Sequence, residues 1–275
     1  FKDALEEASG GRIAVEIFPA SQLGSEPEAM DMVKIGSVQG TRGGAFTKAS
    51  EKYLIWTLPF LYDDTDAVLK AMRSDFGKEI AEAAKANGYY IPATGVAGGF
   101  RQISNNKHPI NTPDDVAGLK IRTPGIETII KTMEALGANP VSIPYGDVYV
   151  ALKTGVADGQ ENPPSNIVAM KFYEAQKYLS VVNYQIHPDA FFVNLGWYEA
   201  LPDDLKVVFD TAAIDAMAWS DENWLASEAG YLDTLKGELE VNEIAPENRA
   251  LFIEAVQPVW DAYIANGTFT AEEVE

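Results

Sequence analysis

The segment 203–236 constrains the fold more than any other part of the sequence. It contains no proline and a single glycine, Gly230, before Gly237 offers a left-handed stop. At ~1.5 Å per residue, one helix over this segment is roughly 50 Å long, well beyond the average helix of a globular protein. A helix of that length cannot be buried against one small sheet. We therefore expect it to span two lobes.

Short β-rich runs alternate with helical stretches along the rest of the sequence. Residues 12–18 alternate like a strand, and the run Ser25-Glu26-Pro27-Glu28 is typical of a capping box that begins a helix. Further strands are predicted at 119–122 and 156–158, with helices between the strands. This order predicts an α/β fold with βαβ units and mostly parallel sheets.

The composition excludes several classes of function. Asp and Glu outnumber Lys and Arg by 41 to 21, which gives a net charge of −20. Such a surface repels phosphate backbones and anionic membranes, so we expect no nucleic-acid partner. The chain has no cysteine, which removes thiolate metal sites and cysteine nucleophiles. No apolar run approaches the ~20 residues that span a bilayer. An anionic ligand would require local positive charge.

Enzyme motifs are mostly absent from the sequence. There is no G-x-S-x-G elbow and no phosphate-binding loop. The two histidines, His108 and His187, each precede a proline and have no second metal ligand nearby in sequence. We interpret both as surface or hinge residues, and we expect no metal, no cofactor and no catalytic residue.

Three arginines lie at the ends or the starts of predicted strands, where a positively charged side chain can bind an anionic ligand. Arg122 ends the run Leu-Lys-Ile-Arg, and ligands of open α/β sheets bind beyond the carboxyl ends of the strands. A guanidinium there can hold a carboxylate by two parallel hydrogen bonds. On position alone, an ordinary surface ion pair is equally consistent for Arg122. Arg101 is a second candidate, for which a structural role is the simpler interpretation, and Arg42 is a weaker third candidate.

A dense polar cluster follows the predicted strand 156–158. Within it, Gly159 permits close backbone approach, and Asn162 can both donate and accept hydrogen bonds before Pro163. An ordinary strand-to-helix turn explains the same pattern. Tyr145 similarly precedes a predicted helix, where it suits either ligand contact or core packing.

Long stretches of the sequence resemble one known family. They include FRQISNNKHPINTPDDVAGLKIRTP, IPYGDVYVALKTGVADGQENP and FYEAQKYLS, and they are similar to the substrate-binding subunits of TRAP transporters, the DctP family. The resemblance implies a two-lobed periplasmic-binding-protein-like fold with hinge strands and a long helix spanning both lobes. It places lobe I at 1–99 plus about 188–227 and lobe II at 100–187 plus about 228–275, with the helix at about 203–236 bridging both.

The resemblance also assigns roles to particular residues. Arg122 matches the arginine that clamps the substrate carboxylate, and Asn162 matches an asparagine that hydrogen-bonds the same region. The other matched positions line the cleft: a second arginine at Arg101, an aromatic residue at Tyr145, a polar residue at Glu161, and Tyr184 near the hinge, where some members carry a ligand-facing histidine.

The function implied is capture of a small organic carboxylate between two lobes, without chemistry, and its delivery to the small and large TRAP membrane subunits. We expect a periplasmic, monomeric protein that does not span the membrane, and we expect this sequence to lack the signal peptide and the first strand of the family. A ligand-binding sensor module of a signalling receptor is the alternative, and an enzyme ranks third. The identity of the acid stays open.

Overall fold

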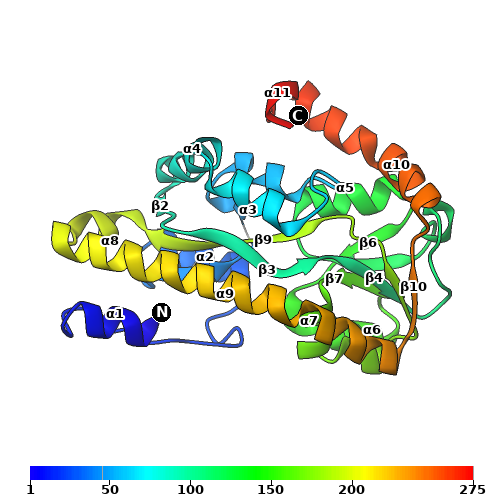
Figure 1. The fold of residues 1–275 in the computed structure, drawn as a ribbon, viewed down its shortest axis with the longest axis horizontal. Coiled ribbons are helices and arrows are strands. Elements are labelled where there is room, and N and C mark those ends of the chain that lie inside the picture. Colours follow the sequence, from blue (N-terminus) through cyan, green and yellow to red (C-terminus); the bar gives the residue numbers. More distant parts are fainter. Residues whose placement is uncertain (45, 275) are drawn as a thin grey trace. The chain divides into compact units, whose positions relative to one another are not determined.

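The computed structural model describes residues 1–44 and 46–274, and these form two compact units (Figure 1). Unit 1 comprises Phe1–Tyr53, Leu69–Val96 and Pro188–Asn223, and unit 2 comprises Leu54–Val68, Ala97–His187 and Trp224–Glu275. Ala45, within the first expected lobe, and Glu275, at the end of the second, lie outside the described residues.

Five elements contribute residues to both units, and the others belong to one. The shared elements are η2 (Glu51–Thr57), α3 (Thr65–Arg73), β3 (Thr94–Phe100), β9 (Ile186–Asn194) and α9 (Asp203–Glu238). Unit 1 further contains α1 (Lys2–Ala8), α2 (Glu26–Lys34), β1 (Gly40–Gly43), η1 (Phe46–Lys48), α4 (Asp75–Ala83), η3 (Ala84–Asn87), β2 (Tyr89–Tyr90) and α8 (Leu195–Ala200). Unit 2 further contains β4 (Gln102–Asn105), η4 (Pro113–Asp115), β5 (Lys120–Thr123), α5 (Glu127–Ala135), β6 (Asn139–Ser142), η5 (Tyr145–Asp147), α6 (Val148–Thr154), β7 (Gly159–Asn162), α7 (Pro164–Ala169), η6 (Phe172–Ala175), β8 (Tyr178–Val181), β10 (Glu240–Glu243), α10 (Pro246–Ala265) and α11 (Ala271–Val274).

The long helix predicted over 203–236 is confirmed as α9, which is continuous over 36 residues. Its part in unit 1 buries Leu205, Phe209, Ala212 and Met217, whose spacing of three to five residues places them along one face. Its part in unit 2 buries Leu235. One uninterrupted helix therefore supplies core residues to both units.

Unit 1 is built on a four-stranded sheet in the order β1-β9-β2, with β3 also paired to β9. The capping box predicted at the start of α2 is confirmed. The Ser25 backbone N–H donates to Glu28 Oε2 at 2.7 Å, and the Ser25 side chain caps the Glu28 backbone N–H. These mutual bonds satisfy backbone donors that the first turn of a helix leaves unpaired.

Unit 2 is built on a six-stranded sheet in the order β10-β8-β4-β7-β5-β6, with helices on both faces. Figure 1 shows α5 and α10 on one side of this sheet and α6 and α7 on the other. One core cluster includes Ile103, Ile121 and Phe252, and a second, on the other face, includes Leu152, Ile167 and Leu179. Ile103 of β4 and Ile121 of β5 belong to the first cluster, whereas Leu179 of β8 belongs to the second.

The expected dominance of parallel pairing is wrong. In unit 1, β1 and β2 both run antiparallel to β9. In unit 2, β5 is parallel to β6 and β7, and β10 is parallel to β8, but β4 is antiparallel to β7 and β8. Segments from distant parts of the sequence enter each sheet, and this depends on tertiary pairing rather than on the local alternation of strands and helices.

The predicted strand at 12–18 does not form. Ile13 is buried, but Ile17 and Phe18 are 59% and 44% exposed, so the alternating positions do not share a buried face. The Ile13 N–H donates to Ser9 Oγ at 3.2 Å, and the Val15 N–H donates to Glu6 Oε1 at 2.7 Å. Side chains at the end of α1 therefore take the backbone donors that a neighbouring strand would use.

None of the helices in the described part of the chain combines the length and the apolar character that a bilayer crossing requires.

Candidate functional site

The candidate residues on β5 and β7 lie on adjacent parallel strands of unit 2. Arg122 on β5 pairs in register with Gln160 on β7, and Asn162 ends β7 two residues later. Residues in register on neighbouring strands share a face, as do residues two apart on one strand. Arg122, Gln160 and Asn162 therefore lie on one face, toward the carboxyl ends of both strands.

The predicted strand at 156–158 is displaced, and its true position explains how Asn162 is held. The Asp158 N–H donates to the Lys120 carbonyl at 2.8 Å, but β7 begins only at Gly159. A Cβ on Gly159 would lie 2.2 Å from the Ser104 carbonyl oxygen, so only glycine permits this pairing. The polar residues 159–162, which were predicted to follow a strand, themselves form β7 and are buried.

Arg122 is almost wholly buried, with 3% of its surface exposed. Its Nε and Nη2 donate to the carbonyl oxygen of Ile143 at 2.8 and 2.6 Å, and Ile143 follows the neighbouring strand β6. The same carbonyl oxygen accepts both bonds. A buried positive charge at this edge supplies the local potential that an anion requires in a chain of net charge −20.

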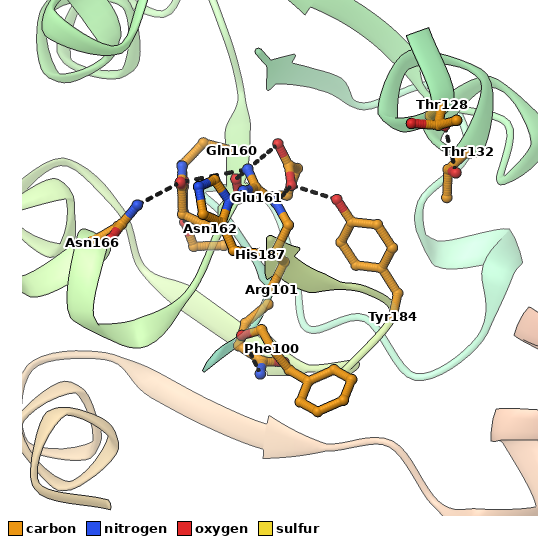
Figure 2. Close-up of polar contacts among 12 residues, drawn as sticks. Phe100, Arg101, Thr128, Thr132, Gln160, Glu161, Asn162, Asn166, Tyr184 and His187 are labelled. Atoms are coloured by element: carbon orange, nitrogen blue, oxygen red, sulfur yellow. Dashed lines mark hydrogen bonds and ion pairs between the residues drawn. The ribbon is translucent and has the colours of Figure 1, made fainter. Parts of the chain in front are cut away.

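Arg101 is committed to Glu161 by several hydrogen bonds. Arg101 Nε donates to Glu161 Oε2, and Arg101 Nη2 donates to Glu161 Oε1 at 2.8 Å and to the Glu161 carbonyl at 2.8 Å. The Tyr184 hydroxyl donates to the same carboxylate, as Figure 2 shows. Both charged side chains are buried, at 1% and 0% exposed. This bidentate pair is a rigid unit behind the edge of the sheet.

The electrostatics of this cluster keep Arg101 charged and Tyr184 neutral. Burial alone would lower the pKa of Arg101, but attraction to Glu161 and hydrogen bonds outweigh it, so the pKa is raised. Burial and the Glu161 carboxylate both raise the pKa of Tyr184. The tyrosine therefore remains a hydrogen-bond donor to Glu161 across the physiological pH range.

His187 belongs to this cluster, although the sequence indicated only a surface or hinge residue. Its Nδ1 contacts Arg101 Nη1. Because a guanidinium only donates, Nδ1 must accept, which makes the imidazole neutral with its proton on Nε2. The missed signal is the position of His187 at the start of β9, three residues after Tyr184.

Tyr145 lies at the start of η5 and is half-buried. Its ring packs edge-on against Phe172, with ring centroids 5.9 Å apart and planes at 78°. Tyr145 also packs against the core cluster that contains Phe172. This contact orients the ring by packing, and the structure places it on unit 2 with the other candidates.

Arg42 is on β1 of unit 1, whereas the other candidates belong to unit 2. It donates through Nε to Asp189 and through Nη2 to Ser220 Oγ, the second bond at 2.9 Å. Burial raises the pKa of Asp189 to about 6, against the opposing effect of Arg42. Arg42 is therefore paired with a buried carboxylate.

No group of three or more His, Cys, Asp or Glu side chains with the geometry of a metal site occurs within residues 1–44 and 46–274.

A hydrogen-bonded row of three buried amides and one hydroxyl begins at Asn162. We call it the polar relay, and it was not recognised from the sequence. It consists of Asn162, Gln160, Ser104 and Gln176, which range from 0% to 7% exposed. Ser104 faces Gln160 across the antiparallel pair of β4 and β7. The sequence signal is weak: polar residues alternate in Gln102-Ile103-Ser104-Asn105, but only the pairing of the strands brings Ser104 to Gln160.

Comparison with known proteins identifies relatives over nearly the whole chain. A family model described as "Bacterial extracellular solute-binding protein, family 7" matches residues 1–266. The C4-dicarboxylate-binding periplasmic protein DctP of Rhodobacter capsulatus is 32% identical over 272 residues, which cover 95% of this chain and 79% of that protein.

Solved structures share the fold at similar coverage. A TRAP periplasmic solute-binding protein of Roseobacter denitrificans, with bound β-D-glucuronate, has a TM-score of 0.94 at 29% identity and covers 99% of this chain and 90% of its own. A TRAP periplasmic solute-binding protein of Sulfurospirillum deleyianum, with bound succinate, has a TM-score of 0.91 at 26% identity, with coverage of 99% and 90%.

Proposed function

Because the chain belongs to the DctP family of bacterial extracellular solute-binding proteins, which serve TRAP transporters, we propose that it binds the carboxylate of a small organic acid at the carboxyl ends of β5 and β7. The protein is the solute-binding component of a TRAP transporter and has the two-lobed periplasmic-binding fold of its relatives. The relatives compared are transport proteins, so the sensor alternative gains no support from them.

The observation that carries the proposal is the buried guanidinium of Arg122. It is 3% exposed, lies near the carboxyl ends of two adjacent parallel strands, and donates to the Ile143 carbonyl. A guanidinium at this position can form two parallel charge-assisted hydrogen bonds to the carboxylate of an acid.

Asn162 supplies hydrogen bonding beside that cation, and Tyr145 supplies an aromatic surface. Arg101, Glu161 and Tyr184 complete the site. Arg101 retains one Nη1 hydrogen without a partner among the described residues, so its direct contribution to the ligand is at most one hydrogen bond. Glu161 and Tyr184 hold Arg101 in place, and we propose that their effect on the ligand is indirect.

The class of acid follows from the relatives as a proposal. Solved relatives were found with succinate, β-D-glucuronate and D-erythronate, which share a carboxylate on a short polar skeleton. We propose that this protein takes an acid of the same kind, acts in the periplasm as a monomer, passes the acid to the membrane subunits, and catalyses no reaction on it.

The proposal is tested by calorimetry with succinate, β-D-glucuronate and D-erythronate. Arg122→Ala should weaken binding of the cognate acid by at least ~2 kcal/mol, or roughly 30-fold in Kd, because a bidentate charged contact is lost. Arg122→Lys keeps the charge but should recover only part of the affinity, because lysine cannot donate two parallel bonds.

Arg12→Ala is the matched control, because it removes one positive charge from an exposed pair with Asp204 in unit 1. It should leave Kd unchanged. Unchanged affinity in Arg122→Ala would remove Arg122 from the site. Absence of binding by all three acids would refute the proposed ligand class, and recovery of a chemically altered acid would refute the absence of catalysis.

A further inference from the structure

The polar relay has a defined direction of hydrogen bonding, which begins at its far end. Gln176 Nε2 lies 2.9 Å from the Ala175 carbonyl oxygen and 3.5 Å from the Asp158 carbonyl oxygen. Carbonyl oxygens only accept hydrogen bonds, so the amide nitrogen of Gln176 must face them. The side-chain oxygen of Gln176 therefore faces the opposite way, toward Ser104.

Each subsequent bond of the relay then has only one possible donor. Ser104 Oγ lies 3.0 Å from Gln176 Oε1 and must donate its single proton there. The same Oγ lies 2.9 Å from Gln160 and can only accept, so the Gln160 amide nitrogen faces it. Gln160 Oε1 consequently faces Asn162, whose Nδ2 donates to it at 2.6 Å.

The surroundings of Asn162 favour the same orientation independently. Asn162 Oδ1 lies 3.5 Å from Arg101 Nη2 and 3.3 Å from Asn166 Nδ2, as Figure 2 shows. Both hydrogens of Arg101 Nη2 are donated to Glu161, but a guanidinium is a cation without an acceptor atom, so the arrangement with the oxygen of Asn162 toward it is the favourable one. The assignment of oxygen and nitrogen in a side-chain amide depends on such partners, and here both ends of the relay agree.

We propose that Ser104, Gln160 and Gln176 are positioning residues that hold the Asn162 amide so that its second Nδ2 hydrogen donates to the bound acid. This inference rests on the proposed function, in which Asn162 contacts the acid. One hydrogen of Nδ2 is used by Gln160, and the other has no partner among the described residues. The relay therefore makes Asn162 a donor toward a carboxylate or hydroxyl oxygen.

The three positioning residues act without touching the acid. Ser104 and Gln160 are 0% exposed and Gln176 is 7% exposed. Loss of the Ser104 hydroxyl would leave the Gln160 amide without its acceptor. Gln160 could then rotate and present its nitrogen to Asn162, where two donors would face each other, and the Asn162 amide would lose its defined orientation.

The test compares Ser104→Ala with Ser180→Ala. Ser180 is also a fully buried serine of the six-stranded sheet, but its hydroxyl donates to Asn242 Oδ1 and accepts from the Ile110 N–H, outside the relay. The first measurement needs no ligand: nitrogen-15 NMR of the Asn162 side-chain amide, whose signals are assigned by their loss in Asn162→Asp.

In the unmutated protein the two amide hydrogens should be well resolved, and one should exchange slowly with solvent. Ser104→Ala should speed that exchange about fivefold or more, since one buried hydrogen bond is lost, whereas Ser180→Ala should not change it. Equal amide spectra in the two variants would overturn the relay, whether or not an acid binds.

The second measurement is calorimetry with the tightest-binding acid among succinate, β-D-glucuronate and D-erythronate. Ser104→Ala and Gln176→Leu should each raise Kd about fivefold, and the double variant should raise it no further, because both break the same relay. Additive losses, or an equal loss in Ser180→Ala, would overturn the positioning role. Failure of every acid to bind would refute the proposed function alone, and the NMR result would still decide the relay.

Discussion

The buried pair of Arg101 and Glu161 allows a sharp test of how unit 2 is stabilised. Glu161→Gln removes the negative charge but leaves a side chain of nearly equal volume. Arg101 then remains 99% buried with its charge uncompensated, since the side chain of Arg101 is 1% exposed in the pair. Removal of one partner of a buried ion pair costs about 3–5 kcal/mol in the free energy of unfolding.

A second change separates the cost of an unpaired charge from the value of the pair. Arg101→Met combined with Glu161→Gln removes both charges, so neither is left buried alone. Replacement of a whole buried pair by neutral side chains is often nearly neutral for stability. Loss of the Arg101 donor to the His187 ring should cost about 1 kcal/mol, whereas the glutamine oxygen can still accept from the Tyr184 hydroxyl. The double variant should therefore be more stable than Glu161→Gln.

Urea unfolding at pH 7 measures these free energies, provided that circular dichroism and tryptophan fluorescence give the same transition. Glu161→Gln should lower the midpoint strongly, and the double variant should recover part of the loss. A Glu161→Gln protein within about 1 kcal/mol of the unmutated one would refute the reasoning. A double variant less stable than the single would refute it as well.

Two further changes test other parts of the structure. Burial raises the pKa of Asp189 to about 6 in the folded protein. Between pH 7 and pH 5 Asp189 therefore binds a proton in the folded state but stays ionised in the unfolded state. The free energy of unfolding should rise by about 1 kcal/mol over this interval as the pH falls. Urea unfolding should show no such contribution in Asp189→Asn, and equal pH dependence would contradict the assignment. Gly98→Ala should lower the free energy of unfolding by about 2 kcal/mol or more. The φ angle of Gly98 is +94°, and the new Cβ would lie 2.1 Å from Ser165 Oγ. Gly118→Ala is its control, with φ of +78° and no atom within 4 Å of the new Cβ, and its melting temperature should fall less.

Local sequence patterns predicted several elements because the physical causes are themselves local. The absence of proline and the single glycine within 203–236 indicated α9, and the capping box at Ser25 marked the start of α2. The strand before Arg122 was predicted from four residues, and β5 ends one residue beyond Arg122. These features depend on side-chain shape, backbone hydrogen bonds and spacing within a few turns of the chain.

Alternation alone was insufficient where a strand needs a partner. Residues 12–18 have the pattern of a strand, yet side chains of α1 take their backbone donors. In unit 2 the pattern placed a strand at 156–158, whereas β7 begins at Gly159 because pairing with β4 starts there. The hydrogen bonds of a sheet come from segments distant in sequence, so local patterning cannot decide them.

The sequence by itself determined the family, the long helix and the presence of a guanidinium at the end of a strand. Only the tertiary structure decided how the two arginines differ: Arg101 is paired with Glu161 inside unit 2, and Arg122 is held by a carbonyl. The orientation of Asn162 likewise depends on Ser104 and Gln176. These distinctions arise because charge and hydrogen-bond partners are set by strand register, which brings together side chains that the sequence separates by tens of residues.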